Sequence, residues 1–99
     1  MNLLFIEPQA KADVRAAVAY YGHAQAGLGA EFSARLRHAF VEILEHPEAH
    51  PSIEPDVRWI LLKQFPFKVF YMPLEEPIRI VAVVHAAAHP DSWKLSRDG

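Results

Sequence analysis

The sequence predicts an α+β fold in which a small, antiparallel-rich sheet carries an αα-hairpin on one face, in the order β-α-α-β-β-β. Three observations predict it. An apolar run opens the chain, two stretches with apolar residues at helical spacing follow, and three runs rich in β-branched and aromatic residues fill the second half. A sheet with one face covered by a helical pair is a two-layer arrangement around one core. The 99 residues suit a single domain over residues 1–99.

The first strand and the first helix are expected to meet at a Glu-Pro pair. Residues 3–6, Leu-Leu-Phe-Ile, are the expected buried strand, which this pair ends. Proline suits the first helical turn because its missing N–H has no partner there, so we predict a helix over about residues 8–26. Its apolar residues recur at helical spacing, whereas Lys11, Asp13 and Arg15 fall mostly on the other side.

A second helix follows the glycine-rich turn at residues 27–29. Arg35 and Arg37 lie off its apolar face and are expected in solvent. The prolines of segment 46–55 stop this helix and predict a loop. The short link between the helices predicts an antiparallel hairpin. The residues of the apolar face, at positions i, i+4, i+8, i+11 and i+12, are Phe32, Leu36, Phe40, Ile43 and Leu44.

Three strands are expected in the second half, over residues 57–62, 67–71 and 78–84. The links between them are short, which favours an antiparallel meander. The last run is apolar at both parities of the strand. We therefore expect it at the centre of the sheet, with both faces covered.

The composition excludes several classes of protein. There is no cysteine, so disulfides and thiolate zinc sites are excluded. No stretch approaches the roughly 20 apolar residues of a membrane span, and the first residues lack the basic segment of a signal peptide. We therefore expect a cytoplasmic protein with no membrane partner. The net charge of -2 gives the fold as a whole no electrostatic attraction to nucleic acid.

Five basic side chains could serve RNA cleavage if the fold gathers them on one face: Arg58, Lys63, Lys68, His85 and His89. Cleavage through the 2′-hydroxyl needs a base, an acid and positive charge at the phosphate, and histidine can supply the first two near neutral pH. Arg58 and Lys68 lie on adjacent expected strands, so the strand register decides whether they share a face. A histidine that ends a buried strand, such as His85, is more often a hydrogen-bonded packing residue.

Neither a metal nor a cofactor is predicted. Two histidine pairs have i, i+4 spacing, His46 with His50 and His85 with His89, but both lie in segments that are not helical. A zinc site needs three or four converging donors. The serines have no nucleophile-elbow motif around them, and no glycine-rich phosphate loop occurs. Catalytic residues therefore stay unassigned, apart from the five that a nuclease would use.

Four segments carry motifs in a fixed order. Residues 20–32 hold Tyr-Tyr followed by Gly-Leu-Gly and Phe, and residues 43–47 end a helix with His-Pro. Residues 57–71, VRWILLKQFPFKVFY, are similar to a block R-x-x-x-L-x-x-F-P-Y-x-I-x-Y, and residues 80–93 to a closing V-x-x-V-x-H-x-x-R-x-P-x-x-W. With this order and spacing, the whole chain resembles the RelE/ParE superfamily of type II toxin–antitoxin toxins, and the ParE-like branch more than the RelE-like one.

The resemblance implies a small cytoplasmic toxin that arrests growth and that a cognate antitoxin neutralises in a hetero-oligomer. ParE-type members poison DNA gyrase, which is the function expected here. RelE-type members cut messenger RNA on the ribosome, which is the alternative. A third reading is a degenerate toxin that only partners its antitoxin.

One departure from the family pattern bears on activity. Family members usually carry one or two arginines after the histidine, where this chain has Ala87 and Ala88. A guanidinium clamps a phosphate or a carboxylate with paired hydrogen bonds, and alanine cannot. Any activity that depends on arginine at these positions is therefore expected to be weakened.

Target binding is expected from cationic, histidine and aromatic side chains in the second half of the chain. Aromatic residues dominate interface energetics, and lysine and arginine side chains add positive charge nearby. The predicted target-binding residues are Lys63, Lys68, His85, His89 and Trp93.

The antitoxin is expected on the second helix and along an open strand edge. An edge strand has unpaired backbone groups that can accept an added strand. Such a partner would be acidic or amphipathic, and disordered when alone. The predicted antitoxin-binding residues are Arg35, Arg37, Phe40, Arg58 and Trp59.

Overall fold

The computed structural model describes residues 4–94, and its element order confirms the predicted α+β class. Leu3, which opens the predicted first strand, lies outside the described residues. One element was not predicted: where the sequence favours a loop, a turn at Pro55-Asp56 folds residues 52–54 back as a short strand. The elements are β1 (Leu4–Ile6), α1 (Pro8–Ala24), α2 (Leu28–Glu45), β2 (Ser52–Glu54), β3 (Val57–Leu61), β4 (Phe67–Met72) and β5 (Ile78–His85).

The sheet has the strand order β1-β5-β4-β3-β2. Strands β2 to β5 form the predicted antiparallel meander, and β1 joins it parallel to β5. β5 is therefore an interior strand flanked by β1 and β4, although the middle strand of the five is β4. The pairing with β1 reaches only to Ile80, whose carbonyl oxygen accepts a hydrogen bond from the Glu7 N–H at 3.0 Å.

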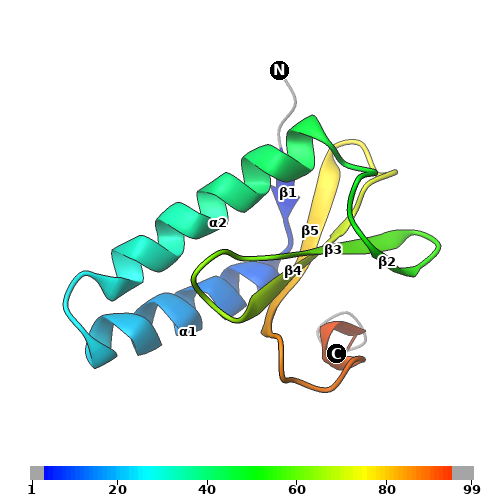
Figure 1. Ribbon diagram of the computed structural model, residues 1–99. Coiled ribbons are helices and arrows are strands. Elements are labelled where there is room, and N and C mark those ends of the chain that lie inside the picture. Colours follow the sequence, from blue (N-terminus) through cyan, green and yellow to red (C-terminus); the bar gives the residue numbers. More distant parts are fainter. Residues whose placement is uncertain (1–3, 95–99) are drawn as a thin grey trace.

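The two helices form the predicted antiparallel hairpin, and both lie on the same side of the sheet (Figure 1). Gly27 links them at a φ of 87°, a conformation that glycine adopts without the steric cost of a Cβ. Gly29, in the first turn of α2, packs closely on α1, since a Cβ there would lie 2.7 Å from the Val18 carbonyl oxygen. Neither helix in residues 4–94 has the length and apolarity that crossing a membrane requires.

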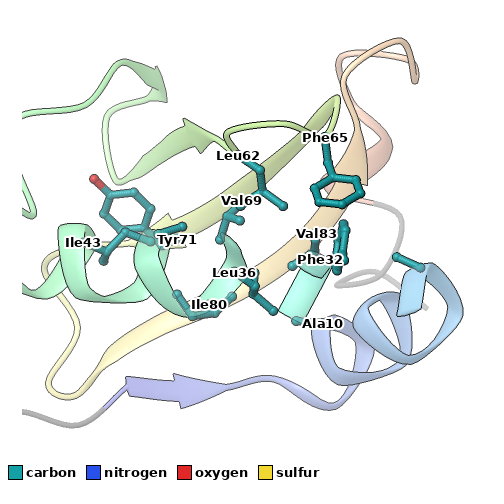
Figure 2. Packing of buried hydrophobic residues seen from close by; sticks show 12 residues of the cluster. Ala10, Phe32, Leu36, Ile43, Leu62, Phe65, Val69, Tyr71, Ile80 and Val83 are labelled. Atoms are coloured by element: carbon teal, nitrogen blue, oxygen red, sulfur yellow. The ribbon is translucent and has the colours of Figure 1, made fainter. Parts of the chain in front are cut away.

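The larger core lies between the hairpin and the sheet (Figure 2). Tyr71 is fully buried within it, and its hydroxyl donates a hydrogen bond to the Pro47 carbonyl oxygen at 2.7 Å. A buried hydroxyl needs such a partner, so this bond ties the loop after α2 to β4. The large buried side chains of this core include Phe32, Leu36, Ile43, Val69, Tyr71, Ile80 and Val83.

A second, smaller core covers the opposite face of the sheet. Trp93, in a helical turn after β5, stacks on Phe70 with ring centroids 5.8 Å apart. A shift of register between Phe70 and Tyr71 leaves Val81 as an extra residue in β5. Val81 and Ala82 therefore both belong to the second core, whereas Ile80 and Val83 belong to the first. The strand is apolar at both parities because both of its faces are covered.

Asp13 makes a contact with the sheet that the helical spacing does not predict. Asp13 is half-buried on α1, and its Oδ2 accepts a hydrogen bond from the Val83 N–H at 3.0 Å. β1 does not extend alongside this part of β5, so the carboxylate takes the place of a strand partner for that N–H. Arg35 departs from its solvent-facing prediction: it is half-buried, and its Nε donates to Gln64 Oε1 at 3.0 Å.

Candidate functional site

Two concave surfaces on opposite sides of the sheet contain half of the predicted site residues. We call the first the α2–β3 groove; it has a volume of about 510 Å³. β2 pairs with β3 only at Val57 and Arg58, so within residues 4–94 the outer edge of β3 has no paired strand from Ile60 onward. The groove therefore combines a helix surface with an open strand edge. Its lining residues are Arg35, His38, Ala39, Glu42, His50, Ile60, Leu61, Leu62 and Lys63.

A short chain of polar side chains positions Arg35 beside this groove. Gln64 accepts a hydrogen bond from Arg35 at 3.0 Å and donates one to Glu31 at 3.0 Å. The backbone of Gln64 has a φ of 75°, which is uncommon for a residue with a side chain. Sequence reasoning missed Gln64, and its only signal is its position in the link between two strands, just before Phe-Pro.

Arg58 has a structural role on the helix-covered face. Its Nη1 donates to the His50 carbonyl oxygen at 2.6 Å, and it pairs in register with Tyr71. Burial raises the pKa of Tyr71 to about 12, the nearby Arg58 charge opposes that rise, and the Glu42 charge adds to it. Arg58 therefore helps to hold the loop after α2 against the sheet.

The register of β3 and β4 separates the five nuclease candidates. Arg58 lies opposite Tyr71, whereas Lys68 lies opposite Leu61, three residues further along β3. Successive side chains alternate between the faces of a strand, so Arg58 and Lys68 point to opposite faces. The shared face that a nuclease would need is therefore not formed by these two residues. Lys63 lies in the α2–β3 groove, apart from Lys68.

The second concave surface, which we call the β4–β5 hollow, brings Lys68, His85 and His89 together. It has a volume of about 90 Å³. The Lys68 ammonium lies 4.3 Å from the centroid of the Trp59 ring, within the range of a cation–π contact. The other lining residues are Ile53, Phe70, Val84, Ala86, Ala88 and Pro90.

Each histidine of the β4–β5 hollow opens a tight turn. His85 Nδ1 accepts the Ala87 N–H at 3.0 Å, and the His85 carbonyl oxygen accepts the Ala88 N–H at 2.9 Å. His89 repeats this pattern, with its Nδ1 3.1 Å from the Asp91 nitrogen and its carbonyl oxygen 2.9 Å from the Ser92 nitrogen. Two successive turns of the same design carry the chain away from β5.

These bonds assign the tautomer of both neutral rings. A ring nitrogen that accepts an N–H carries no proton, so Nε2 of His85 and of His89 carries it. A protonated Nε2 donates a hydrogen bond and can neither take up a proton nor ligate a metal. Neither ring therefore offers a general base at its free nitrogen.

Several predicted binding residues lie away from the two surfaces. Trp93 is only 4 % exposed, so its ring supports the second core and is not presented to a target. Trp59 faces the same side as Lys68, whereas Phe40 lines a different, apolar hollow between the helices. Arg37 is exposed on α2. Of the five predicted antitoxin residues, Arg35 alone lines the α2–β3 groove.

Ala87 and Ala88 lie in the first histidine turn. Both are exposed, and Ala88 lines the β4–β5 hollow. An arginine at position 88 would add a guanidinium at its rim. This chain has only the methyl group of Ala88 there, so the hollow lacks the guanidinium that family members usually carry after the histidine.

One group of candidate metal ligands occurs among the described residues, at the end of α2. Glu42, Glu45 and His46 bring one donor atom each within 4.8 Å of one another, and Glu45 and His46 are exposed. Exposed acidic groups are common without an ion, so this geometry alone does not define a metal site. The absence of a metal stays a prediction.

A helical hairpin on a five-stranded sheet of this order is the fold of RelE/ParE-like toxins, as the sequence predicts. Residues 4–90 match the family described as the ParE toxin of the type II toxin–antitoxin system parDE, and the chain belongs to that family. No curated protein matches the chain significantly.

Two solved structures are similar in fold. One is from the chromosomal ParDE toxin–antitoxin system of P. aeruginosa, with a TM-score of 0.61 and 20% identity over 86% of this chain and 96% of that one. The other is the isolated E. coli RelE toxin, with a TM-score of 0.63 and 18% identity over 99% of this chain and 98% of that one. At these identities both likenesses concern the fold.

Proposed function

We propose that this type II toxin arrests growth by binding DNA gyrase in the cytoplasm, and that a cognate antitoxin neutralises it. The observation that carries the proposal is that Nδ1 of both His85 and His89 accepts a backbone N–H. Both rings have their Nδ1 occupied by backbone N–H groups, so they supply donors and not a general base. With Arg58 on the other face, the chain has a surface suited to gripping a protein more than to cleaving a bond.

Only some of the predicted target-binding residues are proposed to contact the target directly. Lys68, His85 and His89 share one hollow, so these three remain the proposed contacts with the target. Lys63 belongs with the other face, and Trp93 acts indirectly because it stacks on Phe70, which lines the same hollow.

Two purified assays distinguish the targets. Supercoiling by gyrase is measured with added toxin, beside translation with toe-printing on ribosomes. Inhibition of supercoiling alone supports the proposal, whereas cleavage of messenger RNA on ribosomes alone would reject it.

The RelE-like ribonuclease remains the second candidate, because a lysine and two histidines share one hollow. Its test is specific: Ala88→Arg should restore messenger-RNA cleavage if a missing guanidinium is what weakens it. Ala88→Lys is the matched control, since it adds charge without the planar, bidentate geometry. If neither variant cleaves while gyrase is inhibited, the ribonuclease reading fails.

The antitoxin is proposed to dock in the α2–β3 groove. The open edge of β3 from Ile60 onward supports an added strand, and Arg35 at the rim of the groove supports an acidic partner. Hydrogen exchange with and without antitoxin tests this. Protection is expected in α2 and at residues 60–63, and its absence from both segments would reject the docking site.

A further inference from the structure

We infer that the β4–β5 hollow is a receptor for a single carboxylate, supplied by an acidic segment of the target protein. The inference deepens the proposed function, and it rests on that function only in placing the acidic segment on gyrase. Lys68, His85 and His89 carry it, through the polarity of their hydrogen-bonding groups and the absence of any acid among the lining residues.

The hollow presents donors and no side-chain acceptor. The Nε2 groups of His85 and His89 carry protons, and the Lys68 ammonium adds a positive charge. The remaining lining residues are apolar or aromatic. A concave surface with three donor side chains and no carboxylate suits an anion.

Lys68 is a cation without a counter-ion. Within residues 4–94, no carboxylate lies within ion-pair distance of its ammonium, although Lys94 pairs with Glu54 at 2.8 Å and Arg79 with Glu7 at 3.5 Å. Lys68 is also half-buried, so its charge is less well hydrated than the charge of a fully exposed lysine. The Trp59 ring, 4.3 Å from the ammonium nitrogen, offers only a weak partner to the charge.

The size and charge of the hollow favour a protein carboxylate over nucleic acid. About 90 Å³ accommodates one small anionic group, and the apolar rim of Ile53, Val84 and Pro90 suits the methylenes of a glutamate side chain. A nucleic acid backbone needs several cations in a row for useful affinity. Here the nearby Lys94 is already paired with Glu54 and Asp91.

The two histidine turns make the donors rigid. Each ring is fixed by a backbone N–H two residues along the chain, and the His89 turn gains a further bond from the Ser92 hydroxyl to the His89 carbonyl oxygen at 2.6 Å. Donors held in place before binding lose less conformational entropy when they bind.

Binding of small peptides to the full chain tests the receptor without gyrase. The probe is an acetylated Glu-Leu-Glu amide, followed by NMR chemical shifts, and Gln-Leu-Gln is the uncharged control. We expect the charged peptide alone to shift the signals of Lys68, His85 and His89. An equal response to both peptides, or shifts that avoid these residues, would overturn the inference.

Three variants test whether peptide binding depends on the donor groups themselves and not on the stability of the fold. Lys68→Met keeps a long, unbranched side chain and removes the charge, and should weaken binding of the charged peptide by about tenfold. His85→Asn and His89→Asn keep an oxygen that accepts the same N–H in an Asx turn and remove the outward donor. Each should weaken binding by about threefold with the thermal midpoint unchanged.

Lys63→Met is the matched control, because it removes a lysine from the opposite face. A loss of peptide affinity in Lys63→Met as large as in Lys68→Met would overturn the inference. So would single-stranded oligouridylate that displaces the peptide from the same three residues. If peptide binding needs Lys68 while gyrase inhibition does not, the carboxylate receptor stands, and its acidic partner is not gyrase. If gyrase is not inhibited at all while the peptide still binds, the receptor stands and the gyrase proposal fails.

Discussion

The hydrogen bond from the Val83 N–H to Asp13 makes a sharp test of how this small fold is held together. Val83 is 3 % exposed, and β1 stops before it can pair with this part of β5. Truncating Asp13→Ala would leave a buried N–H without its partner. Hydrogen bonds to charged groups contribute about 1.5–3 kcal/mol. Alanine returns up to about 0.7 kcal/mol through its higher helix propensity.

The expected net loss is therefore about 1–2 kcal/mol. With a urea slope of about 1.5 kcal/mol per molar, the unfolding midpoint should fall by about 1 M. Equilibrium urea unfolding, followed by circular dichroism, measures this. Asp13→Asn keeps an acceptor oxygen and should lose less than half as much, because only the charge is removed.

Lys11→Ala serves as the control, because Lys11 is exposed on the same helix and makes no hydrogen bond through its side chain in the described residues. Its midpoint should stay within error of the parent. If Asp13→Ala shifts the midpoint no more than Lys11→Ala does, the Val83 N–H finds water or another partner. The view that this carboxylate completes the sheet would then be wrong.

Three further outcomes follow from the packing. Gly29→Ala should destabilise the chain in urea unfolding, since its Cβ would lie 2.7 Å from a backbone oxygen, whereas Gly22→Ala has open space and should stabilise it by about 0.5–1 kcal/mol. If both glycine substitutions change the free energy of unfolding in the same direction, the close contact between the helices at Gly29 is contradicted. Phe32→Ala should cost about 3–5 kcal/mol in the same assay, because the ring is fully buried. The folded pKa of Tyr71, about 12, lies above its ordinary 10.0, so the unfolded chain deprotonates first. The contribution of protonated Tyr71 to the free energy of unfolding is fully present below pH 10 and should be lost as the pH rises toward 12. In Tyr71→Phe, the free energy of unfolding should therefore decrease less steeply in unfolding curves measured over this pH range.

Hydrophobic spacing was enough to predict the order of the elements and their faces. The spacing of Phe32, Leu36, Phe40 and Ile43 indicates a helix, because a period of 3.6 puts all four on one side, whereas a period of 2 would put Ile43 on the other. The apolar run of β5 requires cover on two faces, and the hairpin and Trp93 provide it. These features depend on the sequence within one element, so sequence reasoning reaches them.

The missed features depend on contacts between elements. The role of Asp13 arises because β1 is too short to pair with the end of β5, a fact that no pattern within α1 reveals. Gln64 acquires its role only when α2 lies beside it. β2 forms because a neighbouring edge is available, and its own three residues carry little strand signal.

The sequence by itself determined the class of this protein: an αα-hairpin on a small sheet, with the motif order of the ParE family. Only the tertiary structure decided how its charged groups are used. The strand register put Arg58 and Lys68 on opposite faces, and backbone N–H groups fixed the proton on each histidine ring. A one-residue slip in register exchanges the two faces of a strand, and a tautomer follows its hydrogen-bond partner. Both therefore depend on where the rest of the chain lies.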